Sequence, residues 1–335
     1  MKLHWMLIFM LIISTAGYCA DKGASDVKKQ EKLNVMGLDM FSALDCGGEI
    51  YLCRIVKRTP ANTSDKTIER GKVELEVVKT ICGVSKDTLT LPYSFPLQVV
   101  KSDYFPIWPV LNEIKERYLI CTVVPSGYEP AAGIFDNVSG AASEVLPVSG
   151  EKDPVVQGME SFCALYKNQD VNTLKISLAK VLIDPQPRIR LYAFRLAVSK
   201  LAAVDPNGAI TLIKNSLEHL ASTGSDPQEI SQIVSLIENA FKKQVGKPFP
   251  SPAALENFGL RCLGELLGSS QKSVRETALF SFASYIGMAT SKATDVFDRD
   301  KSVGLEKILQ DMKASGDKDI STDASEVLKW LAASR

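Results

Sequence analysis

Residues 184–202 read DPQPRIRLYAFRLAVSKLA, where an Asp-Pro turn leads into a segment that opens with two arginines and then becomes apolar. The apolar residues after the turn recur at the spacing of one face of an α-helix. Asp and Pro are typical of the start of a helix, because Asp accepts hydrogen bonds from the first N–H groups and Pro lacks an N–H that would need a partner. The stretch therefore predicts an amphipathic helix, and similar stretches follow it.

This helical pattern returns at nearly regular intervals. Equivalent aliphatic residues occur at Ile189, Ile230, Val274 and Ile320, with separations of 41, 44 and 46 residues. A period of this length is typical of repeated helix pairs, in which one pair buries its apolar face against the next. Second helices of the pairs are predicted at 208–221, 252–268 and 304–314, and 174–183 serves an earlier pair.

The leading segments resemble HEAT repeats. Arg190 and Arg275 stand directly after the aliphatic residue of their segments, where the HEAT family commonly has an arginine that bonds an acidic group in the neighbouring repeat. The resemblance implies this bridging role for both arginines. Two other segments carry Ser231 and Ser321 instead. We therefore predict an irregular HEAT-like α-solenoid of about four to five helix pairs over residues 151–335.

Residues 43–150 have a different periodicity, close to two. Val73, Leu75 and Val77 alternate with charged residues, so one face of that strand is expected to be buried and the other exposed. Strands are predicted at 49–58, 72–81, 87–93 and 116–124. Five or so short strands in about 105 residues suit a small antiparallel β-barrel.

The strand pattern of this half resembles the OB-like barrel of the netrin and tissue-inhibitor-of-metalloproteinase type in bacterial exported proteins. The resemblance lies in VELEVVKTICG, then TLTLP, then ERYLICTVV. Inhibitors of that family reach a protease zinc with a cysteine at the mature N-terminus. Here Cys46 and Cys53 follow a charged leader, so that mechanism does not carry over, and netrin-like protease inhibition stands as an alternative function only.

The first 20 residues have the three regions of a secretory signal: one lysine, an apolar run from Trp5 to Ile13, and small residues. Residues 21–42 are charged and are predicted to be a flexible leader. We therefore predict a periplasmic or secreted protein with no membrane span in the mature chain. The alternative is a lipid anchor at Cys19, although Tyr18 is too large for a typical lipobox.

Six cysteines remain after the predicted signal. Cys163 and Cys262 lie on apolar helical faces and are predicted to be buried thiols. Export permits disulfides, and the candidates are Cys46, Cys53, Cys82 and Cys121, with three pairings if all four bond. A pairing of Cys46 with Cys53 is disfavoured, because seven extended residues span about 23 Å and a disulfide needs Cα atoms within about 7 Å.

The residues offer little for catalysis or for nucleic-acid binding. Lys plus Arg and Asp plus Glu are 39 each, so no net charge favours a nucleic acid. The mature chain keeps one histidine, His219, and has no recognisable motif for a metal, phosphate or dinucleotide, so no cofactor is predicted. Asp298 and Asp300, predicted in a loop, are candidate carboxylates. A carboxylate-based hydrolase in an interdomain cleft is therefore the alternative to a non-enzyme.

Two groups of residues are candidates for binding. The segment 94–110 contains three prolines and an aromatic set that forms either a binding loop at the barrel mouth or a plug against the helices: Phe95, Tyr104, Phe105 and Trp108. Polar positions on the predicted second helices form the other group: Lys214, Glu218, Arg261 and Glu265. The favoured function is a non-catalytic binding or scaffold protein whose partner is another protein or an envelope component.

Overall fold

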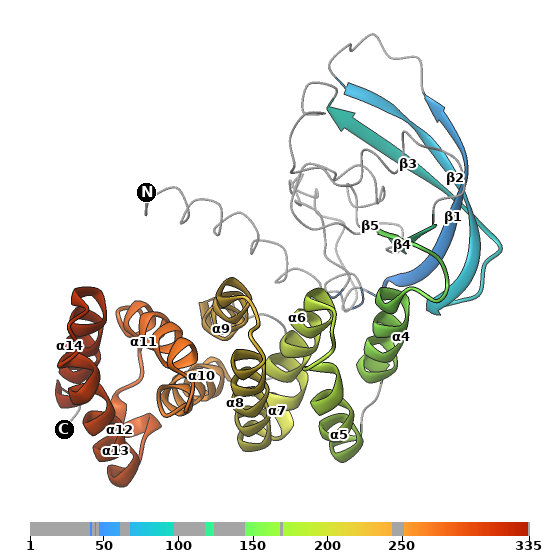
Figure 1. Cartoon of the computed structure of the whole chain (residues 1–335). Helices are drawn as coiled ribbons and strands as arrows, with labels where there is room; N and C mark the ends of the chain where they lie inside the picture. Colours follow the sequence, from blue (N-terminus) through green and yellow to red (C-terminus); the bar gives the residue numbers. More distant parts are fainter. Residues whose placement is uncertain are drawn as a thin grey trace, which may run out of the picture. The chain divides into compact units, whose positions relative to one another are not determined.

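The computed structural model describes residues 41, 44, 47–60, 68–96, 118–123, 145–167, 170–242 and 251–333. The chain divides into two compact units, Met1–Cys163 and Ala164–Arg335. The first unit contains an antiparallel β-sheet, and the second is helical (Figure 1). An N-terminal sheet followed by a C-terminal helical region is the order that the two periodicities predict.

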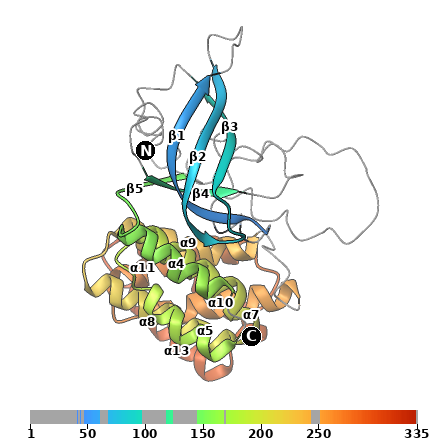
Figure 2. The same ribbon diagram turned by 90° about the vertical axis from the view of Figure 1, so that its right-hand side faces the viewer.

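Five strands form one antiparallel sheet in the order β3-β2-β1-β4-β5 (Figure 2). Their bounds are β1 (Glu49–Pro60), β2 (Ile68–Cys82), β3 (Thr88–Pro96), β4 (Tyr118–Val123) and β5 (Val145–Val148). The central strand β1 pairs with β2 on one side and with β4 on the other. Three register shifts interrupt the β1–β2 ladder, and irregularities of this kind bend a strand pair and increase its twist.

The burial of the strands follows the predicted alternation where the sheet has one covered face. Val73 and Leu75 are buried, whereas Lys72 before them and Glu74 between them are exposed. At the start of β1 the alternation is lost, because four consecutive residues from Ile50 to Cys53 are all buried. Since successive side chains of a strand point to opposite faces, both faces of the sheet are covered there.

Helix α4 (Pro154–Lys167) begins in the sheet unit. Asp153 caps its start, because Oδ1 accepts a hydrogen bond from the Val155 N–H at 2.9 Å. Asp as the cap and Pro as the first helical residue are both favoured at the start of a helix. Phe162 of α4 is buried against Phe41, with ring centroids 6.2 Å apart, and Glu160 forms an ion pair with Lys79 of β2.

The second unit consists of helices that form pairs along the chain. Their bounds are α5 (Val171–Val181), α6 (Pro187–Leu196), α7 (Ala202–Val204), α8 (Pro206–Ser222), α9 (Pro227–Lys242), α10 (Pro252–Leu267), α11 (Lys272–Ile286), α12 (Ala293–Val296), α13 (Arg299–Lys313) and α14 (Lys318–Ala333). A single π-helical turn, η2 (Ala197–Leu201), joins α6 to α7 without a break.

Local sequence explains where these helices begin. Proline is the first residue of α6, α8, α9 and α10. Asp205 and Ser251 cap α8 and α10, because each side chain accepts a hydrogen bond from the N–H three residues later. The helix predicted from residues 184–202 begins at Pro187, so the Asp184-Pro185 pair lies in the turn before it.

The helices of the second unit lie in two layers. Helices α6, α9, α11 and α14 each contact the next one, and so do α5, α8, α10 and α13 (Figure 1). The equivalent aliphatic positions Ile189, Ile230 and Val274 are buried in the layer of α6, α9 and α11, whereas Ile320 of α14 is half-buried. Cys163 of α4 and Cys262 of α10 are buried, as predicted.

Two local predictions differ from the structure. Residues 94–96, predicted to belong to a loop, are the end of strand β3, because Ser94 and Phe95 pair with Arg70 and Glu69 of β2. Asp300 lies in the first turn of α13 rather than in a loop. Asp298 precedes that helix and caps it, with Oδ1 accepting from the Lys301 N–H at 2.7 Å.

Candidate binding surface

The aromatic candidates are only partly described. Phe95 lies in strand β3, in register with Glu69 of β2. Tyr104, Phe105 and Trp108 lie outside the described residues. Both interpretations of this segment, a binding loop and a plug, therefore stay predictions.

The polar candidates lie on two neighbouring helices of the layer formed by α5, α8, α10 and α13, called here the second layer. Lys214 and Glu218 belong to α8, and Arg261 and Glu265 belong to α10. All four side chains are half-buried. The helix contact between α8 and α10 brings these residues, 43 to 51 positions apart in the sequence, onto adjoining surfaces.

A row of polar contacts crosses three helices of this layer. Glu265 of α10 lies between Lys214 of α8, at 3.8 Å, and Lys301 of α13, at 2.7 Å. Further along α10, Arg261 donates a hydrogen bond to Oδ1 of Asn207 in α8. We call Asn207, Lys214, Arg261, Glu265 and Lys301 the second-layer polar strip. Its residues come from three successive helix pairs.

Glu218 connects α8 to the turn that follows α10. Its Oε1 accepts hydrogen bonds from Ser269 Oγ at 2.7 Å and from the Ser270 N–H at 2.9 Å. Burial opposes ionisation of this carboxyl, but the hydrogen bonds from Ser269 and Ser270 outweigh burial and lower its pKa. Glu218 is therefore held as a carboxylate by its neighbours, and this contact also stabilises the fold.

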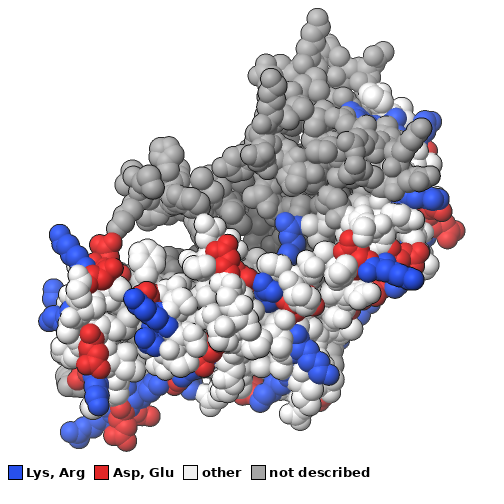
Figure 3. Space-filling view, in the orientation of Figure 1, with Lys and Arg blue, Asp and Glu red and all other residues white. Residues whose placement is uncertain are grey.

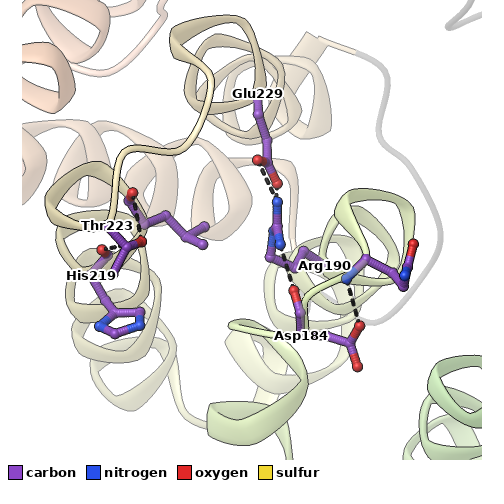
Figure 4. A network of polar contacts seen from close by, with 7 residues as sticks. Asp184, Arg190, His219, Thr223 and Glu229 are labelled. Atoms are coloured by element: carbon purple, nitrogen blue, oxygen red, sulfur yellow. Dashed lines mark hydrogen bonds and ion pairs between the residues drawn. The ribbon is translucent and has the colours of Figure 1, made fainter. Parts of the chain in front are cut away.

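Arg190, in the stretch 184–202, bridges two helix pairs. Arg190 of α6 donates from Nε and Nη2 to the two carboxylate oxygens of Glu229 in α9, each at 2.5 Å (Figure 4). It also donates to the backbone carbonyl of Asp184. The side chains of Arg190 and Glu229 are 9% and 11% exposed. Such a buried, bidentate pair fixes one helix against the next.

Arg275 occupies the equivalent place in α11 and, like Arg190, donates to backbone carbonyls in the turn before its helix. It donates to the backbone carbonyls of Ser269 and Ser270, at 2.7 and 3.0 Å. The Ser269 carbonyl is six residues before Arg275, as the Asp184 carbonyl is six residues before Arg190. Both arginines therefore tie the turn before their helix to the first turn of that helix.

Within the described part of the chain, the side chain of His219 belongs to no polar cluster. The residue is exposed, and its imidazole points away from Arg190 and Glu229 in Figure 4. Its backbone carbonyl accepts hydrogen bonds from Ser222 Oγ at 2.7 Å and from Thr223 Oγ1 at 3.0 Å. This position agrees with a solvated helix residue.

The sheet brings two of the four disulfide candidates side by side. Cys53 of β1 and Cys121 of β4 are buried with their sulfur atoms 3.3 Å apart, whereas Cys82 lies at the end of β2 opposite Ile50. Cys46 is outside the described residues.

The surface of the described residues carries both signs of charge. Lys and Arg side chains lie intermixed with Asp and Glu on the face drawn in Figure 3. Within the described ranges, no group of three or more His, Cys, Asp and Glu side chains is placed to hold a metal ion. Among the helices of the same ranges, none is both long and apolar enough to cross a membrane.

Comparison with known proteins adds no functional information. No family model and no curated protein match the chain. Among solved structures, a crystal structure of an engineered protein matches with a TM-score of 0.28 and 19% sequence identity, over 55% of this chain and 76% of the other. A likeness this weak carries no argument about fold or function.

Proposed function

We propose that this chain is an exported binding or scaffold protein whose helical unit binds a protein or envelope component without catalysis. The observation that carries the proposal is the second-layer polar strip. Its side chains come from α8, α10 and α13, and each makes a hydrogen bond or an ion pair to a neighbouring helix of the row. A row of this kind on successive helix pairs suits an extended macromolecular partner.

The HEAT-like interpretation of the helical unit is part of the proposal. It is supported by equivalent aliphatic residues 41, 44 and 46 positions apart and by two layers in which each helix contacts the next. The buried pair of Arg190 with Glu229 supports it further, because it joins successive pairs at the position that the family uses.

The OB-like interpretation of the sheet unit is also part of the proposal. The first strand pairs with both the second and the fourth, as in a five-stranded Greek-key barrel. In such a barrel β3 and β5, the two ends of the strand order β3-β2-β1-β4-β5, would lie next to each other. The register shifts between β1 and β2 favour the strong curvature that a small barrel needs.

A site-specific cross-linking experiment tests the binding face. A photoreactive amino acid replaces Asn215, an exposed residue of α8 beside Lys214, and its cross-links are captured from the native envelope fraction. The matched control carries the same amino acid at Phe280, which is 66% exposed on α11 in the other layer. We expect a discrete partner at Asn215 that the Phe280 variant does not capture.

The same experiment can contradict the proposal. Identical captured proteins at both positions, or none at Asn215 in a folded and exported protein, would exclude the second-layer face as the binding site. Export is tested separately by a periplasmic reporter fused after residue 30, whose activity should disappear when Leu11 and Ile12 are changed to Asp.

A further inference from the structure

Cys53 and Cys121 are neighbours in the centre of the sheet. The register pairs Cys53 with Leu119 and Tyr51 with Cys121, so the two cysteines are diagonal neighbours on one face. Their sulfur atoms are 3.3 Å apart, and both side chains are 0% exposed. Since a disulfide bond is about 2.05 Å long, the sulfur atoms need to approach by only about 1.3 Å to form one.

We propose that Cys53 and Cys121 form a structural disulfide that cross-links the central strand β1 to β4. The register argues against Cys82 as the partner of either cysteine. Cys53 lies opposite Val77, five residues from Cys82 along β2, which is about 16 Å of strand. Cys121 and Cys82 lie on β4 and β2, on opposite sides of β1, so two strand spacings, about 9.5 Å, separate them, and a disulfide needs Cα atoms within about 7 Å. The proposal rests on the export proposed above, because disulfides persist in oxidising compartments.

The bond requires a disulfide donor, either a small molecule such as oxidised glutathione or a thiol–disulfide exchange protein. One cysteine thiolate attacks the donor disulfide and releases one donor thiol, which leaves a mixed disulfide on the chain. The other cysteine then attacks that mixed disulfide and releases the second donor thiol. The two cysteines lose two hydrogens in total, and the donor is reduced to two thiols.

The burial of both sulfur atoms predicts when the bond forms. The hydrogen bond with Cys53 and burial in the sheet raise the pKa of Cys121, so little of the reactive thiolate is present in the folded state. A donor also cannot reach two fully buried sulfur atoms. The exchange therefore takes place before the sheet closes, and the folded, reduced protein should react slowly with the same donor.

Refolding in a glutathione redox buffer tests the inference on the full mature chain. The reduced, unfolded protein is refolded, unfolded again without reductant, alkylated and digested for mass spectrometry. We expect a linked peptide pair that contains Cys53 and Cys121, lighter by two hydrogens than the separate peptides and absent after reduction. Folded, reduced protein in the same buffer should form the bond much more slowly.

Matched variants keep the result interpretable. Cys53→Ala should abolish the linked pair, whereas Cys82→Ala and Cys46→Ala should retain it. Quantitative alkylation of Cys53 and Cys121 after refolding, or linkage of either one to Cys46 or Cys82, would overturn the inference. Because a variant could fail to fold, the wild-type peptide map decides the outcome by itself. Refolding does not involve export, so a reporter that stays in the cytoplasm would refute export and leave the refolding result as the test of the cysteine pair.

Discussion

Replacement of Arg190 by Met should strongly destabilise the helical unit. The change removes both hydrogen bonds to the Glu229 carboxylate and the hydrogen bond to the Asp184 carbonyl. The side chain of Glu229 is only 11% exposed, so water cannot fully replace the lost guanidinium. Removing one partner of a buried ion pair costs about 3 to 5 kcal/mol, because the other charge stays buried without compensation.

This free energy corresponds to a large change in melting temperature. In a domain of about 150 to 250 residues, a loss of 1 kcal/mol lowers the melting temperature by about 2 to 4 °C. The expected decrease for Arg190→Met is therefore about 6 to 20 °C. Thermal unfolding of the full chain, followed by far-ultraviolet circular dichroism and by calorimetry, measures it, because the helical signal reports mainly on Ala164–Arg335.

A second variant separates the ion pair from simple loss of packing. In the double variant Arg190→Met with Glu229→Leu, no charge is left buried, so most of the lost stability should return. Lys272→Ala is the matched surface control, since its 79% exposed side chain pairs with Glu276 one helical turn away and should contribute less than about 0.5 kcal/mol. A single variant that loses under about 1 kcal/mol, or a double variant no more stable than the single one, would refute the buried-pair argument.

Three further predictions concern packing, acidity and the cross-link. Gly264→Ala should destabilise the protein by about 1 to 3 kcal/mol, because a Cβ there would lie 2.9 Å from the Phe297 ring. Gly304→Ala should stabilise it by about 0.5 to 1 kcal/mol, because the space around this residue of α13 is open. Urea unfolding measures both changes. Because the fold lowers the pKa of Glu218, its carboxylate stabilises the folded protein at pH values above its ordinary pKa of 4.5, and this stabilisation is lost as the pH falls through the lower folded pKa. Glu218→Gln removes that dependence, so the urea midpoint of the variant should decline less below about pH 4.5. Reduction of the proposed disulfide should lower the stability of the sheet unit by about 4 kcal/mol, the value expected for a loop of this length, and parallel urea titrations with and without reductant measure it.

The positions of most helices could be predicted because their starts are determined locally. Asp153, Asp205 and Ser251 each satisfy N–H groups within three residues of themselves, and a proline follows directly after each. Apolar periodicity then gives the face that is buried. The short strand β5 lacks such signals, because four residues are too few to show an alternation.

Contacts between helices were harder to predict, although one of them left a signal. Arg190 directly follows Ile189, and Glu229 directly precedes Ile230, so opposite charges flank the equivalent aliphatic residues of successive segments. That pattern could have identified Glu229 as the partner. The sequence singled out Lys214 and Glu265 as polar surface positions but did not indicate that they form a pair, because that depends on the offset between two helices.

The sheet shows the same division between local and long-range information. Strand segments follow from alternation, but the choice among cysteine pairings depends on which strands become neighbours. Cys53 and Cys121 are 68 residues apart, and only the pairing of β1 with β4 brings them together. Sequence spacing disfavoured only the pairing of Cys46 with Cys53 and could not choose between the other two pairings.

The second-layer polar strip restricts how a partner could be bound. Its cationic side chains already face an acceptor, because Lys214 and Lys301 contact Glu265 and Arg261 contacts Asn207. The whole chain has no formal net charge, so long-range attraction contributes little to the encounter with a charged partner. Recognition at this face would then depend on shape and on hydrogen bonds from the partner that replace the hydrogen bonds within the strip. A partner that binds there would replace contacts between helix pairs and so couple binding to the stability of the helical unit.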